Sequence, residues 1–451
     1  MDIAIIGGGL SGTLLAHYLL QEDKFPLTVY LFEKDYHQLS RGIAYRASTE
    51  GQLLNVPAGR MSLHNHQPDD FYKWLCAHVS KEIQPEEFVP RSLFGTYLKE
   101  VFQKSIDQAK YVTVRVITDE VMDIIKHEDQ LHVITIKNHT HTVARAVVAT
   151  GILAPQDPFT VTLDVRFSGL YQSNPWSFRY QDKLKANDHI VLIGMGLTML
   201  DHATSLLKGN KNLILSVFSR RGLLPLAHAE YEPYSFPEYT IIPAADIGTL
   251  LRSVRLYYKT HQRKGLDWRD LIDRIRTQVP QLWKALSVQS RSRFIRHLKP
   301  YWEIHRHRAP AVILDRVKKA MQEGRFTILK GRIQDVKTTV STLQLSITNQ
   351  QKTITLETNF LLNSSGLQQN ISLTSDPLLR KLMEHGYMIP DDNGLGTETD
   401  EEGALECKQG EKNIFTLGAL RRASVFECTA AKEIGEQAFA LSRILLKQKT
   451  T

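Results

Sequence analysis

Cysteine is scarce in this sequence of 451 residues: Cys76, Cys407 and Cys428 are widely separated, and no two of them form a C-x-x-C pair. This spacing excludes a disulfide framework and a dithiol relay, and it favours a reducing, cytoplasmic setting. No H-E-x-x-H or comparable ligand set is present, so we expect no metal site. The chain starts without a basic segment followed by an apolar run, so no signal peptide is expected.

Long apolar runs are also missing. None approaches the roughly 20 residues that cross a bilayer, so we expect no membrane partner. Charge of one sign is only mildly in excess, because 56 basic and 48 acidic residues give +8. The most basic stretch, residues 247–308, also contains acids, and we interpret it as a solvated or interdomain helical insert rather than a nucleic-acid-binding surface. Those acids are Asp267, Asp270, Asp273 and Glu303.

The strongest pattern lies in the first 34 residues. An apolar run leads into GGGLSG at positions 7–12, and helical apolar spacing and a second β-type run follow. This order predicts the strand, glycine turn, helix and strand of a dinucleotide-binding unit. Gly7 allows the tight turn, Gly9 lets a pyrophosphate approach the helix N-terminus, and Gly12 allows helix and strand to pack closely. Glu33, 21 residues after Gly12, is placed to bind a ribose.

A second unit of the same design begins at Ile190. Its glycine segment is GMGLTM at positions 194–199, with Met199 in place of the third glycine. The next strand ends in Ser219-Arg220-Arg221 rather than in an acid. Hydroxyl and guanidinium groups bind a 2′-phosphate that a carboxylate would repel, which favours NADPH over NADH. The alternative is that these arginines lie on a solvated strand end.

Several β-type runs lie between and after the two units. The runs at 113–116, 121–125, 131–136 and 141–148 are interpreted as one meander, which leads into Ala149-Thr150-Gly151. A later run, 359–362, leads into Asn363-Ser364-Ser365-Gly366. Both segments end in a small residue and a glycine, and we expect both beside a cofactor.

Polar and basic residues outside the glycine motifs are further candidates. Loops on a dinucleotide-binding scaffold often carry ligand contacts, although such residues are also commonly just solvated. Arg91 precedes a helix and could offer a forked donor to a phosphate, the alternative being a surface arginine. A long C-terminal helix from Thr429, its expected N-cap, would direct its positive end at the site. The loop candidates are Asn55, His64, Asn65 and His66.

The motifs together resemble a known family. They are GGGLSG, GIAY with LLNVPAGRMS, FVPRSLFGTYL, ATG, GMGLTMLD, SRRGLLP, RHLKPYWEIHRHRAP, NSSG and LGALRRASVFECTAAKEIGEQA. Their order resembles that of bacterial FAD/NAD(P)-binding flavoproteins of largely unknown substrate, which are related to flavin-dependent N-hydroxylating monooxygenases. The resemblance implies an α/β fold with two Rossmann-like dinucleotide-binding domains. The FAD domain, 1–160 and 355–451, would be split by an NADPH domain, 161–354, that carries the helical insert 247–308.

The resemblance also implies the cofactors FAD and NADPH and their binding residues. Arg91 would lie near the FAD pyrophosphate and Asn55 near the flavin. Ala419 stands where many relatives have an aspartate for the flavin ribitol, so ribitol contacts would come from elsewhere. No catalytic residue is singled out. The expected cofactor-binding residues are Gly7, Gly9, Ser11, Gly12, Glu33, Asn55, Arg91, Thr150, Gly151, Gly194, Gly196, Thr198, Ser219, Arg220, Arg221, Gly366 and Gly418.

The expected activity is that of an NADPH-dependent FAD monooxygenase. It would use O2 to oxygenate a small-molecule nucleophile such as an amine, through a peroxyflavin. One alternative is an NADPH-linked flavin reductase or dehydrogenase without oxygen insertion. Another is a flavin-binding redox sensor or interaction protein, which Met199 and Ala419 favour.

Overall fold

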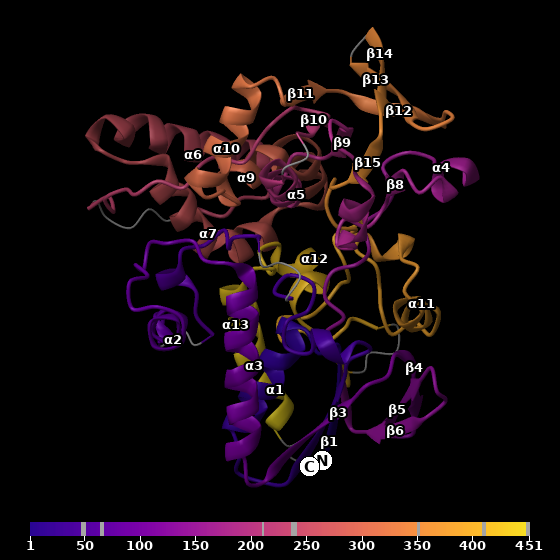
Figure 1. The fold of residues 1–451 in the computed structure, drawn as a ribbon. Helices are drawn as coiled ribbons and strands as arrows, with labels where there is room; N and C mark the ends of the chain where they lie inside the picture. Colours follow the sequence, from indigo (N-terminus) through magenta and orange to yellow (C-terminus); the bar gives the residue numbers. More distant parts are fainter. Residues whose placement is uncertain are drawn as a thin grey trace.

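Two parallel five-stranded sheets organise the molecule, one in the lower half and one in the upper half of the view in Figure 1. The computed structural model describes residues 1–46, 51–63, 67–209, 212–235, 241–349, 352–407 and 412–447. The candidates His64, Asn65 and His66 therefore lie outside the described residues. Within that part of the chain, no helix is long and apolar enough to cross a membrane.

The first sheet has the strand order β16-β7-β1-β2-β3. Its central strand β1 is buried on both faces, which explains its unbroken apolar run. Helices α1, α3 and α13 pack on one face, together with the short helix α2. A three-stranded antiparallel sheet and α11 cover the other face. The bounds are β1 Asp2–Ile6, α1 Leu10–Gln21, β2 Leu27–Phe32, α2 Asp70–His78, α3 Arg91–Gln108, β3 Val112–Ile117, β4 Val121–His127, β5 Gln130–Thr135, β6 Thr140–Val143, β7 Arg145–Val148, α11 Pro377–Glu384, β16 Ile414–Thr416 and α13 Ala431–Leu446.

The second sheet repeats this plan with the strand order β11-β10-β9-β15-β8. Helices α5 and α10 pack on one face, and a second antiparallel sheet and α4 pack on the other. The predicted α/β class with two Rossmann-like domains is confirmed. The bounds are α4 Leu163–Phe167, β8 Tyr171–Gln172, β9 His189–Ile193, α5 Leu197–Lys208, β10 Ile214–Ser219, α10 Ala311–Gln322, β11 Phe326–Lys330, β12 Arg332–Thr338, β13 Leu343–Asn349, β14 Lys352–Thr358 and β15 Phe360–Asn363.

Three strand assignments from the sequence are wrong in detail. The run 113–116 is β3, which pairs in parallel with β2 rather than with the meander. The run 141–148 is divided between β6 of the meander and β7 of the first sheet. The predicted return to the first domain at residue 355 is too early, because β15 pairs with β9 in the second sheet. A short buried apolar run fits either parallel sheet, so its sequence does not specify which one.

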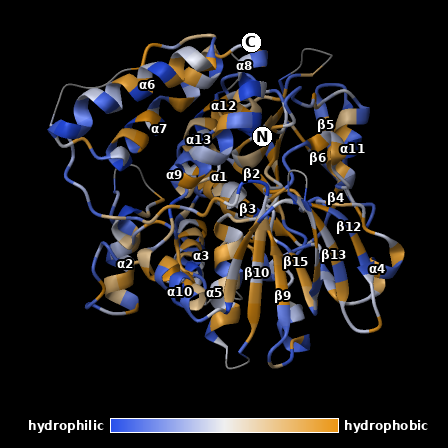
Figure 2. Cartoon of the chain, turned by 90° about the horizontal axis from the view of Figure 1, so that it is seen from above, coloured by the Kyte–Doolittle hydropathy of each residue, from blue (hydrophilic) through white to orange (hydrophobic). Residues whose placement is uncertain are grey.

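The basic stretch forms the predicted helical insert. Its helices are α6 Ile247–His261, α7 Trp268–Ala285, α8 Val288–Arg293 and α9 Lys299–Arg306, with a π-helical turn at Phe294–Leu298. Their apolar residues pack together and against Leu395 and Phe426 from the C-terminal part of the chain. Figure 2 shows the blue, hydrophilic residues of α6 and the orange, apolar strands β9, β10 and β15. The insert is therefore an interdomain element whose aromatic residues serve packing.

The C-terminal segment carries the short helix α12, Arg422–Val425, before α13. Trp283 of α7 stacks on Phe426 with ring centroids 4.5 Å apart. Its Nε1 donates to the carbonyl oxygen of Ala423 at 2.7 Å. The N-cap of α13 is Ala430, so the prediction that Thr429 caps this helix is wrong. These contacts join the insert directly to the first domain.

Candidate functional site

In the first glycine turn, close backbone packing requires glycine at two positions. Gly7 has φ +111°, and a Cβ there would lie 2.8 Å from the carbonyl carbon of Ala149. A Cβ at Gly12 would overlap the backbone oxygen of Gly7. Gly9 differs, since a Cβ there would meet Gly42 Cα at an ordinary 3.4 Å. The protein itself thus has room for a side chain at Gly9, which is consistent with space kept for a pyrophosphate at the N-terminus of α1.

Glu33 lies directly after β2 and borders the glycine turn. Its Oε2 accepts a hydrogen bond from Gly8 N at 3.0 Å, and its Oε1 accepts one from Asp35 N at 3.0 Å. Burial raises the pKa of Glu33, and the two backbone N–H groups oppose that rise. Each carboxylate oxygen keeps a second lone pair, so the group is able to accept ribose hydroxyls as well.

An arginine that the sequence analysis did not single out lies beside this turn. Ser40 N donates to Gly8 O at 2.7 Å, which holds the segment 40–42 against the glycines. In this segment, Arg41 contacts Thr96 Oγ1 through NH2 at 3.4 Å. Its Nε is buried without a hydrogen-bond partner among the described residues. A half-buried guanidinium that keeps a buried, unsatisfied Nε beside a pyrophosphate-type turn fits an anionic ligand. The sequence pattern that could have identified Arg41 is a basic residue soon after the second strand of the dinucleotide-binding unit.

Arg91 is engaged elsewhere. Its Nε donates to Leu53 O at 2.9 Å, and its NH2 lies 3.0 Å from Asp201 Oδ2 in α5. Both side chains are only 12% exposed, so this is a buried ion pair between the two domains. Burial raises the pKa of Asp201 to about 6, although Arg91 opposes the rise. The role of Arg91 at the FAD pyrophosphate stays a prediction.

Removing Arg91 should destabilise the protein in a pH-dependent way. We expect Arg91→Met to cost about 3 to 5 kcal/mol near neutral pH, since it leaves Asp201 buried without its counter-charge. The folded-state pKa of Asp201 is about 6, above its usual value of 3.8. The stability that the raised pKa of Asp201 contributes is therefore full below pH 3.8 and is lost as the pH rises through about 6. Urea unfolding should therefore show a smaller defect at about pH 5 than at about pH 7.5. Adding Asp201→Asn should restore most of the stability, and a defect independent of pH would contradict this account.

The second glycine turn repeats the geometry of the first. Gly194 has φ +101°, and a Cβ there would lie 2.5 Å from Ser365 Cα, just after β15. Gly196 is the N-cap of α5, and a Cβ there would meet no protein atom within 4 Å. Thr198 lies in the first turn of α5, whereas Met199 is fully buried in the domain core. This open space is where a second dinucleotide is expected to approach.

The two arginines predicted to bind the 2′-phosphate follow β10 but have different surroundings. Arg221 donates to His297 O at 3.0 Å and to Arg296 O at 2.7 Å, so it binds the π-helical turn of the insert. Ser219 Oγ accepts a hydrogen bond from Gly222 N at 3.0 Å. Arg220 is exposed to solvent. Arg220 is therefore better placed than Arg221 to receive an incoming phosphate.

Arg220→Ala should impair NADPH binding and leave NADH binding unchanged. We expect a loss of roughly 10- to 100-fold in NADPH affinity, as for one charge-assisted hydrogen bond. NADH lacks the 2′-phosphate, so its affinity for the same variant is the internal control. Fluorescence titration of both nucleotides measures the effect. Equal losses for the two nucleotides, or none, would remove the 2′-phosphate assignment.

The turns after β7 and β15 meet between the two domains. Leu153 and Gln368 form an isolated antiparallel bridge across the gap. Gly151 has φ +75° and Gly366 has φ +110°, and a Cβ at either would meet no atom within 4 Å. Thr150 Oγ1 is buried without a partner among the described residues. A solvent-open cavity lies here, lined by Gly151, Ile152, Leu153, Leu367, Gln368, Gln369, Ala419, Leu420, Arg422 and Thr429.

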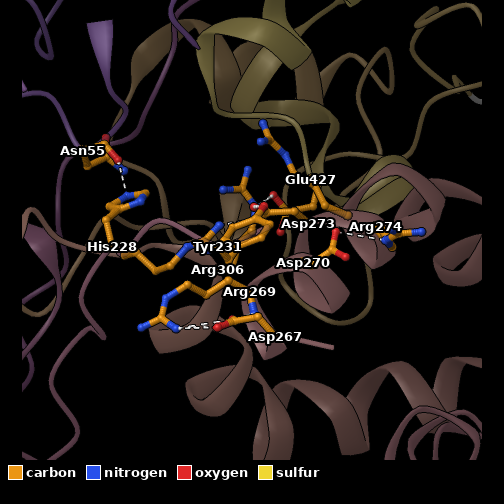
Figure 3. A network of polar contacts seen from close by, with 12 residues as sticks. Asn55, His228, Tyr231, Asp267, Arg269, Asp270, Asp273, Arg274, Arg306 and Glu427 are labelled. Carbon is orange, nitrogen blue, oxygen red and sulfur yellow. Dashed lines mark hydrogen bonds and ion pairs between the residues drawn. The ribbon is translucent and has the colours of Figure 1, made fainter. Parts of the chain in front are cut away.

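The remaining predicted residues border the first domain's side of this region. Gly418 has φ +73°, and its N–H donates to Gln437 Oε1 at 3.0 Å. A Cβ at Gly418 would lie 2.9 Å from Ser11 Oγ, so those two predicted residues lie together. Asn55 is half-buried, and its carbonyl oxygen is 2.9 Å from Nε2 of His228 in the second domain (Figure 3). Burial lowers the pKa of His228 to about 4, so the ring is neutral at pH 7.

A network of buried polar contacts fixes the insert over the first domain (Figure 3). Tyr231 donates to Asp273 Oδ2 at 2.7 Å. Arg306, at the end of α9, pairs with Glu427 at 3.3 Å and with Glu433 of α13 at 3.5 Å. Arg306 and Glu427 are each under 9% exposed. Ion pairs between segments that are distant in sequence therefore hold the insert against the C-terminal part of the chain.

Comparison with known proteins agrees with this architecture. Residues 4–153 match a family model described as FAD-NAD(P)-binding, and no curated protein is similar in sequence. Similar solved structures include an ornithine N-hydroxylase from Kutzneria sp. 744, with 14% identity, 98% of each chain covered and a TM-score of 0.63. An L-lysine 6-monooxygenase from Pseudomonas syringae also shares 14% identity over 98% of each chain, with a TM-score of 0.65.

A thioredoxin reductase from Lactococcus lactis is more distant. It shares 11% identity, with 98% of this chain and 97% of that chain covered and a TM-score of 0.54. At these identities the likeness concerns the fold. The predicted relation to two-dinucleotide-domain flavoproteins is confirmed at the level of the fold, and the first domain contains the residues that match the FAD-NAD(P)-binding family model.

Proposed function

We propose that this chain, whose first domain is an FAD/NAD(P)-binding domain, is an NADPH-dependent FAD oxidoreductase that uses O2 to oxygenate a small-molecule nucleophile such as an amine. The observation that carries the proposal is the meeting of the turns after β7 and β15 at one cavity, bridged by Leu153 and Gln368. Ligands of parallel sheets bind outside the carboxyl ends of the strands. Cofactors on the two domains would therefore present their reactive ends to the same space.

The first domain fits FAD. Gly9 leaves room at the N-terminus of α1, and Arg41 offers an unsatisfied donor beside it. Glu33 is held at the end of β2, where it is able to accept hydrogen bonds from ribose. Thr150 Oγ1 is buried without a partner at the cavity end of the domain. FAD, when bound, supplies the hydride acceptance and the reaction with oxygen that protein side chains cannot provide.

The second domain fits NADPH. Gly196 leaves open space at the N-terminus of α5, where backbone N–H groups favour a pyrophosphate. Ser219 ends β10 and Arg220 follows it, at the place that selects for a 2′-phosphate. Arg221 holds the insert against this strand end, so it positions the site rather than contacts the nucleotide.

The chain also orients the two domains and lines the cavity with apolar side chains. The Arg91–Asp201 ion pair joins the first domain to the second. The hydrogen bond from Trp283 to Ala423 O joins the insert to the C-terminal part of the first domain. Ile152, Leu153, Leu367 and Leu420 give the cavity apolar walls on which an apolar part of a substrate would pack. The similar folds of an ornithine N-hydroxylase and a lysine monooxygenase support oxygenation as the general kind of reaction.

An NADPH-linked flavin reductase is the second candidate, and the likeness to a thioredoxin reductase favours it. Its usual dithiol acceptor is not available, because the three cysteines form no C-x-x-C pair. Electrons would then pass to an organic acceptor or to O2. The two functions differ in what becomes of the oxygen.

The fate of labelled oxygen distinguishes the two candidates. FAD-loaded protein is reduced with NADPH without air and then mixed with 18O2 and a panel of small amines. We expect a product that carries one 18O atom, with less hydrogen peroxide formed than NADPH consumed. Peroxide equal to the NADPH consumed with every amine tested would contradict oxygenation and favour the reductase.

A further inference from the structure

The cavity between the domains carries more positive than negative charge on one wall. We infer that this wall is a subsite for an anionic oxygen group, a carboxylate or a phosphate, bound through Arg422 with Lys299 beside it. The inference rests on the proposed function, because it concerns the cavity that both dinucleotide sites face. It adds the chemical class of the group that the cavity receives.

Arg422 is the cation that lines the cavity directly. Its side chain is 11% exposed, and NH2 donates to Glu303 Oε1 of α9 at 3.1 Å. The guanidinium carbon lies 5.0 Å from the ring centroid of Phe426. Its Nε is buried without a hydrogen-bond partner among the described residues. The guanidinium is therefore held rigidly at the wall with donor capacity left over.

Lys299, the first residue of α9, lies behind Gln369. Its Nζ donates to Gln369 Oε1 at 3.0 Å, and Gln369 itself lines the cavity. An ammonium group has three N–H donors, and the acceptor of this hydrogen bond, the Gln369 amide, carries no charge. Among the described residues Lys299 forms no ion pair within 4 Å. Burial, and then Arg422 and Arg220, lower the pKa of Lys299 to about 8 although Glu303 opposes the fall, and the group stays mostly charged at pH 7.

The nearby carboxylates do not balance these cations. Glu303 bonds Arg422 and also lies 3.0 Å from Nε2 of His307, so one acid faces two cations and an imidazole. The next acids, Glu427 and Glu433, are paired with Arg306. Glu433 also pairs with Arg276. A buried excess of positive charge is costly unless a counter-ion binds, and guanidinium and ammonium groups select carboxylate or phosphate oxygens.

The experiment compares a small anion with its neutral isostere. FAD-loaded protein is titrated with acetate and with acetamide at constant ionic strength, and the visible flavin absorbance reports occupancy of the cavity. We expect acetate to bind more tightly than acetamide. Lys299→Gln should weaken acetate binding by roughly 10- to 100-fold and leave acetamide unchanged. Lys299→Arg, which keeps the charge, should retain most of the acetate affinity.

Lys284→Gln is the matched control, because Lys284 is an exposed lysine of the same insert that pairs with the exposed Glu401. It should bind acetate as the unaltered protein does. Saturating NADP+ identifies the source of the natural anion: undiminished acetate binding assigns the subsite to the substrate, and competition assigns it to a phosphate of the dinucleotide.

Equal affinities for acetate and acetamide, no response to either, or unchanged acetate binding in Lys299→Gln would each overturn the anion subsite. A failure of the proposed function looks different. In that case the purified protein does not bind FAD, or its FAD is not reduced by NADPH, and both are established before the titration begins.

Discussion

Gly12→Ala is expected to yield protein that is strongly destabilised and retains little FAD. The added Cβ would overlap the backbone oxygen of Gly7 and would lie 3.0 Å from Ile5 Cγ2. A rotamer change cannot relieve an overlap with backbone, so we expect a cost at or above the ~3 kcal/mol upper end of ordinary overpacking. That is a large part of the ~5 to 15 kcal/mol by which domains are stable. Urea unfolding and the ratio of flavin to protein absorbance measure the two effects.

Gly9→Ala is the matched control in the same turn. Its Cβ would meet Gly42 Cα at 3.4 Å, so the fold should persist with nearly unchanged stability. FAD affinity should still fall, because the methyl group would occupy the space kept for the pyrophosphate. If Gly12→Ala were as stable as the unaltered protein, the close crossing of β1 and α1 would be wrong.

Gly196→Ala is expected to lower NADPH affinity selectively. A Cβ at this position meets no protein atom within 4 Å, and the backbone angles, φ −85° and ψ −170°, suit alanine. Stability and FAD content should therefore be unchanged. A methyl group placed against a pyrophosphate should cost about 1 to 3 kcal/mol, or roughly 5- to 150-fold in affinity. Titration with NADP+ measures the loss.

Gly209→Ala provides the comparison at the other end of α5. Its Cβ would lie 3.7 Å from Leu206 O, an ordinary contact, so the substitution is also tolerated by the fold. It lies at the helix C-terminus, away from the glycine turn, and should leave NADP+ binding intact. Normal NADP+ binding by Gly196→Ala would place the dinucleotide somewhere other than the N-terminus of α5.

Local sequence patterns were sufficient to predict the two dinucleotide units. A side chain at Gly7, Gly12 or Gly194 would collide with backbone atoms. The glycines of the sequence motif are therefore the ones that the packing of the turns requires. The assignment of β15 failed because three buried apolar residues followed by a buried asparagine do not specify which parallel sheet the strand joins. The cap of α13 was placed at Thr429 rather than Ala430, an error within the usual uncertainty of helix ends.

The candidate site depended more on contacts between distant segments. Arg91 and Arg221 were predicted to meet phosphates, yet one pairs with Asp201 and the other binds carbonyls of the insert. Neither partner is near in sequence, so no local pattern reveals the pairing. Lys299 and Arg422 lie within motifs that carry the family resemblance, but only the fold brings them to the same wall.

Anaerobic mixing of FAD-loaded protein with NADPH tests the central claim most directly, namely that the two dinucleotide sites serve one cavity. The visible absorbance of the oxidised flavin should disappear on mixing with NADPH, and NADH should act much more slowly. Slow or absent reduction by both nucleotides, in protein that carries its full complement of FAD, would contradict the claim.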